Sequence, residues 1–209
     1  MTLPVHTSGL FDEVDARFIV VPGVLTEREC HRIVARNRPL TVPHEPVVGG
    51  SLWAHPIDDA ADLCGVQPRL FGLFQSLLED FGWPIDLDIG RFGVSGYTAG
   101  DSMAAHYDDE VRGSPPWDIQ HRGISFSLQL SPPGAYEGGE LQIRTGQDPG
   151  RWSATSRHRD DVWETAPADR GALIAFGSST MHEVRPVTAG ERWVLLGWGY
   201  CNHDQRSIR

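Results

Sequence analysis

A histidine and an aspartate separated by one residue, His106 and Asp108, form the pair in this chain whose types and spacing most directly suggest chemistry. Side chains alternate between two faces in an extended strand, so both would point the same way while Tyr107 points to the other side. A neutral imidazole and a carboxylate, joined by a second histidine, make the facial triad that holds non-haem Fe(II) with open positions. The pair therefore predicts a metal site that a histidine from elsewhere in the chain must complete.

His182 is the histidine whose surroundings best suit that role. It follows an apolar run at residues 171–176, which has the composition of a strand, and Arg192 stands ten residues beyond it. A pair of strands could bring His182 and Arg192 into one cavity. The arginine would then offer a carboxylate two parallel hydrogen bonds from a planar guanidinium, a geometry that lysine does not provide.

Two kinds of segment must position these residues. The N-terminal part predicts a short strand at residues 18–21, a helix that starts at the capping-box pair Thr26 and Glu29, and a longer helix over residues 68–81. Behind them, short apolar or alternating runs are divided by Gly and Pro clusters, and we expect strands at residues 86–92, 123–130, 141–143, 172–176 and 193–199. This order predicts a mainly β fold with supporting N-terminal helices, an α+β chain built on a barrel or double-sheet jelly roll.

Length, charge and cysteine use limit the function classes. The 209 residues fit a single domain, with helical support and loops over residues 1–84 and the β core with the metal site over residues 85–200. The formal net charge of -10 opposes binding to a nucleic-acid backbone. Because no run of about 18 apolar residues occurs, a membrane is not expected as a partner either. The three cysteines form no CxxC pair, so a cytoplasmic location is expected.

Four stretches in this order resemble the Fe(II)/2-oxoglutarate-dependent dioxygenases, specifically their prolyl-4-hydroxylase-like branch. They are Tyr97-x-x-Gly100 before the His106 pair, residues 127–131 with the Glu-Gly-Gly-Glu-Leu run at 137–141, residues 171–176 before His182, and residues 186–192. The resemblance covers roughly residues 85–200 and implies a double-stranded β-helix, the jelly roll that cupins also have.

The resemblance also implies roles for single residues. Iron is expected on the predicted triad of His106, Asp108 and His182. The distal carboxylate of the cosubstrate 2-oxoglutarate is expected on Arg192, with further cosubstrate contacts from Tyr97, Ser127 and Gln129. Many relatives have a second tyrosine three residues before the first ligand, where this chain has Met103. The implied reaction couples reduction of O2 to decarboxylation of 2-oxoglutarate, which releases succinate and CO2 while a substrate is oxidised. Related halogenases have a small residue at position 108, so the aspartate favours hydroxylation.

Two loop regions, residues 43–58 and 109–122, are expected to select the substrate. The candidate contacts, each weighed against a solvated or structural role, are Trp53, Asp109, Trp117, His121 and Arg122. Residues 39–58 are expected to form a loop or irregular strands, and their Gly49-Gly50 pair is compatible with a lid. Arg144 begins a polar stretch that is expected to be an exposed insertion. Since little room is left for a substrate domain, we expect an amino acid, a peptidyl residue or a small biosynthetic intermediate as substrate.

Two alternatives stay open from the residues alone. A nucleic-acid demethylase of the same superfamily would use this iron site on a flipped base. The net charge opposes it, and residue 198 is Trp where that branch has a second arginine. A cupin-like protein that binds metal or sugar without oxygen chemistry is the other alternative, and it would form no succinate from 2-oxoglutarate.

Overall fold

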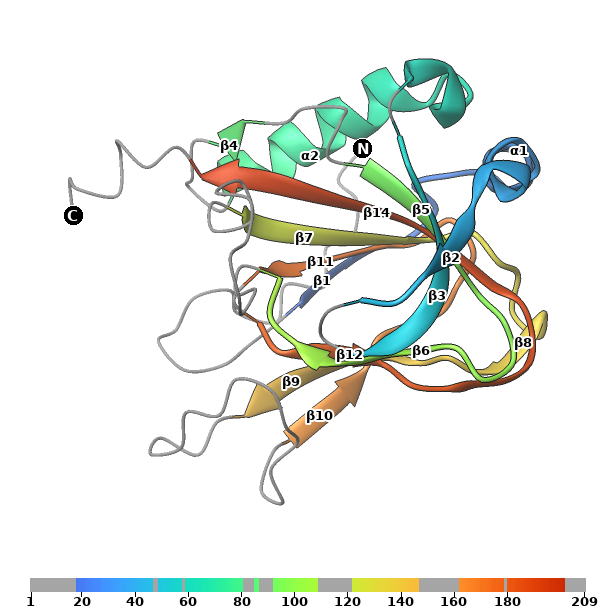
Figure 1. Cartoon of the computed structure of the whole chain (residues 1–209). Coiled ribbons are helices and arrows are strands. Elements are labelled where there is room, and N and C mark those ends of the chain that lie inside the picture. The colour runs from blue at the N-terminus through green and yellow to red at the C-terminus, as the bar shows by residue number, and fades with distance from the viewer. Residues whose placement is uncertain are drawn as a thin grey trace.

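The computed structural model describes residues 18–46, 49–57, 59–80, 85–86, 92–108, 122–146, 162–178 and 180–201. Among the described residues, antiparallel strands form one large curled sheet and a separate two-stranded sheet of Tyr136–Gly138 and Val187–Gly190, and the helices cover one outer side of the large sheet (Figure 1). In chain order the elements are β1 (Phe18–Val21), α1 (Glu27–Asn37), η1 (Arg38–Leu40), β2 (Val42–His44), β3 (Gly50–Pro56), η2 (Ala60–Leu63), α2 (Gln67–Asp80), β4 (Ile85–Asp86), β5 (Phe92–Tyr97), β6 (Ser102–His106), β7 (Arg122–Gln129), β8 (Tyr136–Gly138), β9 (Leu141–Gly146), β10 (Val162–Thr165), β11 (Leu173–Gly177), β12 (His182–Val184), β13 (Val187–Gly190) and β14 (Arg192–Cys201).

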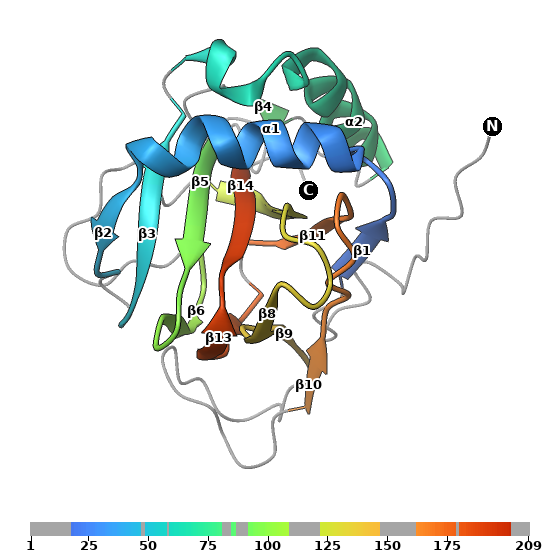
Figure 2. The ribbon, with the colours of Figure 1, turned by 90° about the vertical axis from the view of Figure 1, so that its right-hand side faces the viewer.

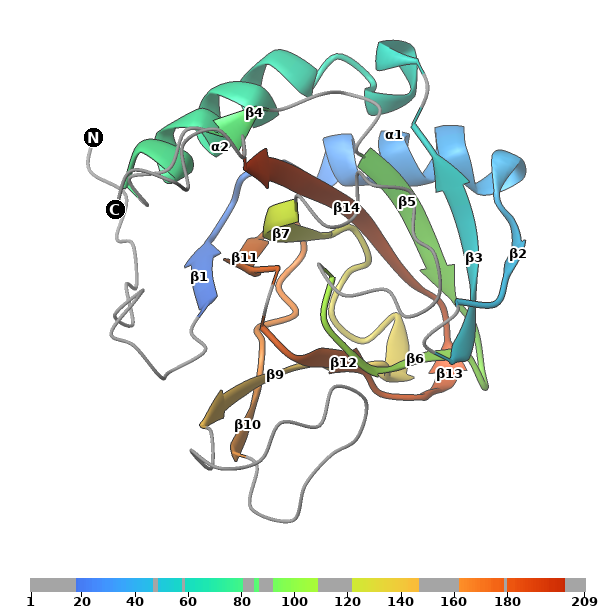
Figure 3. The same ribbon diagram turned by 60° about the vertical axis from the view of Figure 1, so that its left-hand side comes forward.

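The curled sheet has two halves that face each other. The strand order is β1-β11-β7-β14-β5-β3-β6-β12-β9-β10, and we call the part from β1 to β3 the major half and the part from β6 to β10 the minor half. Figure 3 shows the helices above the major half and the minor half below it. This arrangement is the double-stranded β-helix that the sequence predicts, and the fold-class prediction is confirmed.

β3 carries the sheet from one half to the other. Along most of its length it pairs with β5, and at its first residues Gly50 and Ser51 it pairs with β6. At Gly50 the chain has a φ of 106° and comes so close to β6 that a Cβ would lie 2.3 Å from the carbonyl oxygen of Ser102. Only glycine tolerates both conditions, so Gly50 permits the crossing between the halves.

The two helices form for the local reasons that the sequence predicts. The Glu29 N–H donates to the Thr26 hydroxyl, and the Thr26 N–H donates to the Glu29 carboxylate, so the capping box at the start of α1 is present. Figure 2 shows α1 crossing the strands of the major half on its outer side. The side chains that α2 buries against the same side are Leu70, Phe74 and Leu77. No helix among the described residues is long and apolar enough to cross a membrane.

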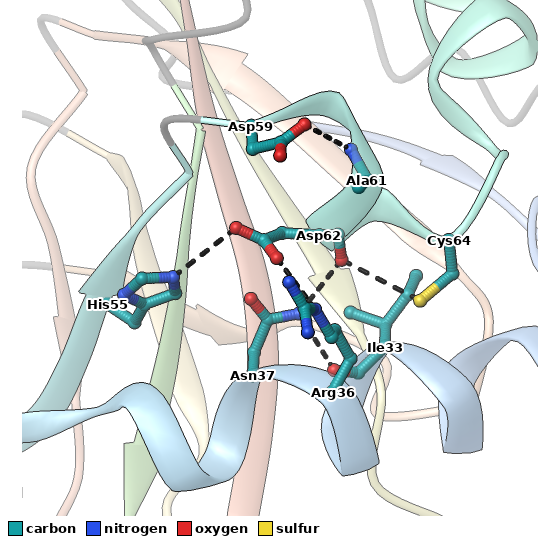
Figure 4. A network of polar contacts seen from close by, with 8 residues as sticks. All are labelled: Ile33, Arg36, Asn37, His55, Asp59, Ala61, Asp62 and Cys64. Atoms are coloured by element: carbon teal, nitrogen blue, oxygen red, sulfur yellow. Dashed lines mark hydrogen bonds and ion pairs between the residues drawn. The ribbon is translucent and has the colours of Figure 1, made fainter.

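A partly buried polar network joins α1, β3 and η2 (Figure 4). The Asp62 carboxylate accepts a 2.8 Å hydrogen bond from Nε of Arg36, and its other oxygen lies 3.6 Å from Nε2 of His55. The Asn37 amide donates to the backbone carbonyls of Ile33 and Asp62. Because His55 belongs to β3, this network brings the first helix close to the strand that links the two halves of the sheet.

Most predicted strands are confirmed to within a few residues. The runs at 123–130, 141–143, 172–176 and 193–199 correspond to β7, β9, β11 and β14. The predicted strand at 86–92 falls on β4 and on the first residue of β5, and residues 87–91 lie outside the described part. Residues 39–58, predicted as a loop or irregular strands, contain η1 and the two paired strands β2 and β3. The structure therefore has more regular sheet in this region than the Pro- and Gly-rich composition indicates.

Candidate metal and cosubstrate site

Strand register brings the two histidines together. β12 pairs with β6 in the minor half, and the two residues directly opposite each other are His182 and His106. Opposite residues of an antiparallel pair project from the same face, and the centroids of the two rings lie 4.2 Å apart. Two imidazoles from positions 76 residues apart thus meet on the inner face of the minor half.

Asp108 joins them from outside the strand. β6 ends at His106, so the prediction that one strand carries both residues is corrected: Asp108 lies just beyond the strand end. Its Oδ1 is 3.5 Å from Nε2 of His106, and its Oδ2 is 3.7 Å from Nε2 of His182. One ligand atom from each of the three residues lies within 4.8 Å of the other two. The donor set is two imidazole nitrogens and one carboxylate, which suits non-haem Fe(II).

Hydrogen bonds to the backbone orient both imidazoles. Nδ1 of His106 lies 2.8 Å from the carbonyl oxygen of Ala104, and Nδ1 of His182 lies 2.9 Å from that of Thr180. A carbonyl can only accept, so each Nδ1 carries the proton and each Nε2 keeps its lone pair for a metal. Burial, with a contribution from the neighbouring His106, lowers the pKa of His182 to about 4. The ring is therefore neutral near pH 7, as metal binding requires.

Arg192 supplies a buried positive charge on the opposite half of the sheet. It is the first residue of β14 and is only 2% exposed. Nη2 donates a 3.2 Å hydrogen bond to the side-chain oxygen of Gln129, while Nη1 finds no hydrogen-bond partner among the described residues. A guanidinium carbon 5.3 Å from the Tyr97 ring centroid places the charge over that ring. A buried cation with an unused donor is suited to an anionic ligand.

Neighbouring polar side chains hold the arginine in this position. Nε2 of Gln129 donates to the Ser127 hydroxyl at 3.1 Å, which turns the amide oxygen of Gln129 toward Arg192. Burial raises the pKa of Tyr97 to about 12, although Arg192 acts against this shift. The phenol therefore stays neutral and can act as a hydrogen-bond donor.

The metal-ligand group and Arg192 open onto one cavity. Its volume is about 550 Å³, and its lining includes the triad together with Tyr97, Ser127 and Arg192. Met103, three residues before His106, also lines it. The structure thus brings together a candidate metal centre and a candidate anion site that come from opposite halves of the sheet.

Comparison with known proteins identifies the family. The model of the 2OG-Fe(II) oxygenase superfamily matches residues 92–200, which is more than half of the chain and contains the triad and Arg192. The chain belongs to this superfamily. A PKHD-type hydroxylase of Synechococcus sp. (strain JA-2-3B'a(2-13)) is 35% identical over 184 residues, which cover 88% of this chain and 67% of the relative.

Solved structures share the fold of this chain. A prolyl-4-hydroxylase of Pseudomonas putida superposes with a TM-score of 0.63 and 18% identity over 90% of this chain and 94% of that one. The α-ketoglutarate-dependent epimerase SnoN from nogalamycin biosynthesis superposes with a TM-score of 0.66 and 18% identity, over 90% and 79%. The match to the PKHD-type hydroxylase of Hyphomonas neptunium covers only 38% of that relative's length. Family and fold are thus shared, while the activities of these relatives differ.

The remaining predicted site residues divide into three groups. Gln129 contacts Arg192 but lines a smaller neighbouring cavity of about 270 Å³. Trp53 lies opposite Gly96 of β5, which in turn lies opposite Trp193 in the core under the helices, so the expected substrate contact of Trp53 is not supported. Asp109, Trp117 and His121 lie outside the described residues, and only the backbone of Arg122, at the start of β7, is described.

The sequence analysis did not identify three residues at or near the site. The Ser125 hydroxyl donates to Oδ2 of Asp108 at 2.5 Å, and the backbone carbonyl of Ser178 accepts from the Asp108 N–H at 2.9 Å. The alternation of Ser125 with Ser127 along β7 is the signal that could have identified the first of them. Arg144, expected in an exposed insertion, is instead buried and donates to the Tyr107 hydroxyl at 2.7 Å. No local pattern distinguishes Arg144 from the exposed arginines of this chain.

Proposed function

We propose that this protein is an Fe(II)- and 2-oxoglutarate-dependent hydroxylase of an amino acid, a peptidyl residue or a small biosynthetic intermediate. It would use O2 and release succinate and CO2. The observation that carries the proposal is the shared cavity of a His-Asp-His ligand group and a buried arginine with an unused donor.

The residues present fit both groups that the family name implies. Fe(II) would be held by Nε2 of His106, Nε2 of His182 and the Asp108 carboxylate, all of which face one another. The distal carboxylate of 2-oxoglutarate would take the free Nη1 of Arg192. When bound, iron and 2-oxoglutarate supply the oxidising chemistry, in which O2 is reduced as the cosubstrate loses CO2.

The protein's own contribution is placement and exclusion of water. The two imidazoles are locked in one tautomer by the Ala104 and Thr180 carbonyls, so no proton has to leave Nε2 before a metal binds. Arg192 is buried, so its attraction to an anionic carboxylate is screened less than at the surface. Tyr97 remains a neutral donor beside it. These features support a site prepared for one divalent metal and one small dicarboxylate.

The lining away from Arg192 bears on the substrate. Leu196 and Trp198 follow Arg192 along the same face of β14, and Val42 and Ala54 form a pair on β2 and β3. Among the described lining residues, Asp108 and Arg192 carry the only formal charges apart from histidines. This composition supports a substrate whose reacting part is apolar. The net charge of -10 supports a small molecule or peptide over a nucleic acid.

Free thiols on Cys30 and Cys64 support a cytoplasmic, reducing location as a further part of this proposal. Burial raises the pKa of the Cys30 thiol to about 11, so that residue is an inert core side chain and no candidate for catalysis.

An anaerobic titration tests the proposal. Fe(II) is added to the metal-free protein, then 2-oxoglutarate, and the weak visible charge-transfer band of the chelated cosubstrate is followed. We expect a band that saturates at one equivalent of each. Absence of the band with tightly bound metal would favour the cupin-like alternative. Candidate substrates are then screened for succinate release above the background measured without substrate, beginning with apolar amino acids, short peptides and neutral small molecules.

A further inference from the structure

Gly93 is a glycine inside strand β5 at a position where the fold does not require one. Its φ lies outside the left-handed region that favours glycine. A Cβ at this position would have, among the described atoms, only the carbonyl oxygen of His55 within 4 Å, at an ordinary contact distance of 3.6 Å. Glycine weakens a strand, and where it is kept it often marks the close approach of a ligand. Neither backbone conformation nor packing against the protein accounts for Gly93.

Gly96, three residues later in the same strand, shows the contrast. A Cβ there would lie 2.5 Å from a ring atom of Trp193, in the core under the helices. Real Cβ atoms essentially never come that close to another heavy atom. Gly96 is therefore explained by the tryptophan that packs on it, whereas the space next to Gly93 is empty of protein.

This empty space lies on the cavity face of the sheet. Phe92 and Val94, on either side of Gly93, are buried in the core under the helices. Successive residues of a strand point to opposite faces, so a side chain at position 93 would point into the cavity, as those of Ser95 and Tyr97 do. All three of these positions line the cavity of about 550 Å³.

The neighbouring strands supply the walls of the space. Figure 2 shows β3, β5 and β14 side by side, and Gly93 lies opposite Pro56 of β3 and Leu196 of β14. Both of these residues also line the cavity. The missing side chain thus leaves a depression in the cavity wall between a proline and a leucine, and we call it the Gly93 hollow.

The Gly93 hollow lies away from the metal ligands and from Arg192. Arg192 is opposite Tyr97, four residues along β5 from Gly93, which corresponds to about 13 Å along the strand. The Asp108 carboxylate is held by Ser125 of β7, and β7 lies two strands from β5, about 10 Å across the sheet. A dicarboxylate held between the metal ligands and Arg192 would therefore leave the hollow open.

We propose that Gly93 is a specificity-determining residue and that the Gly93 hollow takes a bulky apolar group of the substrate, such as a branched or aromatic side chain. The inference deepens the proposed function and rests on it. Pro56 and Leu196 offer apolar contacts, and none of the described residues that flank Gly93 on this face carries a charge. A charged group placed here would be desolvated without a partner, so an apolar group fits better.

Binding of indole, a neutral aromatic probe, tests the hollow without turnover. The protein is loaded with Co(II) in place of Fe(II) and with 2-oxoglutarate, and the NMR signals of indole are followed, since a paramagnetic metal broadens the signals of a molecule bound near it. We expect Gly93→Leu, which fills the hollow, to weaken indole binding by about 10- to 100-fold, the range for burial of one large apolar side chain. Gly93→Ala should weaken it less. Both variants should bind 2-oxoglutarate as the wild type does.

Stability measurements separate this role from folding. Gly93→Ala and Gly93→Leu should unfold at the wild-type temperature or above, because a side chain replaces a strand glycine without a clash. Gly96→Ala is the matched control on the other face of β5. It should lower the unfolding temperature, while its folded fraction binds indole as the wild type does.

Turnover gives a second measure of the same hollow. In the substrate screen, Gly93→Leu should lose succinate release with compounds that carry a branched or aromatic group and keep it with compounds that lack one. Equal indole affinity in the wild type and Gly93→Leu, or no indole binding by the loaded wild type, would overturn the inference. An equal loss of 2-oxoglutarate affinity in Gly93→Leu would also overturn it, since the residue would then belong to the cosubstrate pocket.

The same experiment distinguishes failure of the hollow from failure of the proposed function. If the wild type binds neither Co(II) nor 2-oxoglutarate, the proposed function fails and the inference fails with it. If it binds both, and indole binding does not depend on residue 93, only the role of Gly93 is lost.

Discussion

The two faces of β7 are equally buried and yet differ completely in composition. Phe126 and Leu128, toward the helices, are 2% and 1% exposed, while Ser125 and Ser127, toward the cavity, are 2% and 4% exposed. On the helix side the rings of Phe74 and Phe126 stack at 4.1 Å. On the cavity side, the Ser125 hydroxyl donates to Asp108, and the Ser127 hydroxyl accepts from Gln129, which in turn accepts from Arg192. Burial alone therefore does not tell which side chains stabilise the fold and which belong to the candidate site. The contacts that each buried side chain makes do tell them apart.

This contrast has a physical basis in the cost of burying polar groups. An unpaired hydroxyl or amide in an apolar interior costs about 1–3 kcal/mol, so a serine is retained there only where it is hydrogen-bonded. Leucine at the same depth contributes through apolar area alone. The strand's period of two assigns one role to each face. Variants on the two faces should accordingly fail in different ways.

The largest expected effect is on the cavity side, from His182→Ala. Removing a residue that hydrogen-bonds to a metal ligand typically lowers metal affinity by up to roughly 100-fold. Loss of one of the three ligands themselves should lower Fe(II) or Co(II) affinity by more than that. Turnover should fall to background. Metal titration with parallel thermal unfolding measures this, and His31→Ala, an exposed histidine on α1, is the matched control. Wild-type affinity in His182→Ala would refute the triad.

On the helix side, Leu128→Ala should lower the free energy of unfolding by about 2–5 kcal/mol, because the side chain is fully buried and its removal leaves a cavity. Urea denaturation measures the change. The folded fraction should bind Co(II) and 2-oxoglutarate as the wild type does. A loss of ligand affinity comparable to that of a cavity-side variant would break the division between the faces.

Arg192→Gln tests the anion site, with a smaller expected effect. Removing the guanidinium should cost about 1.5–3 kcal/mol of 2-oxoglutarate binding, which is roughly 10- to 100-fold in affinity. Calorimetric titration in the presence of Co(II) measures it. Metal affinity without the cosubstrate should not change, and Arg192→Lys should retain part of the affinity. If 2-oxoglutarate bound Arg192→Gln normally, its anchor would have to lie elsewhere.

The smallest effect is expected at the start of α1. The Arg69 guanidinium, hydrogen-bonded to Glu29, lowers the pKa of that carboxyl to about 2, below its usual value of 4.5. Since the folded-state pKa is depressed, the contribution is present above pH 4.5 and disappears as the pH falls toward 2. Glu29→Gln should cost at most about 1 kcal/mol near pH 7. Unfolding curves of both proteins should converge toward pH 2, and a constant difference would exclude an ionic origin.

Local patterns in the sequence were sufficient for several elements. The capping box of Thr26 and Glu29 is an interaction over three residues, and it appears as predicted. The strands β7, β11 and β14 follow from apolar and alternating runs, since period two is visible in a single segment. The types of the site residues also followed, because a metal of this class requires imidazoles and a carboxylate wherever the fold places them.

Other features depended on contacts between distant segments. The sequence predicts that Trp53 is a loop aromatic near the cavity. The register of β3 against β5 instead puts it on the same face of the sheet as Trp193, which packs in the core under the helices. A shift of one residue would have reversed that face, and no local pattern specifies the shift. Arg144 is buried for the same reason, since the reach of its side chain to Tyr107 depends on how β9 and β12 pair.

The sequence by itself determined which chemical groups this protein has and in what order: a His-x-Asp pair, a later histidine and an arginine ten residues beyond it. The tertiary structure alone decided how they work together. His182 lies opposite His106 through strand register, and Asp108, outside the strand, is oriented by Ser125 and Ser178 from the facing half of the sheet. Periodicity is a property of one segment, whereas the geometry of a metal site depends on the packing of several.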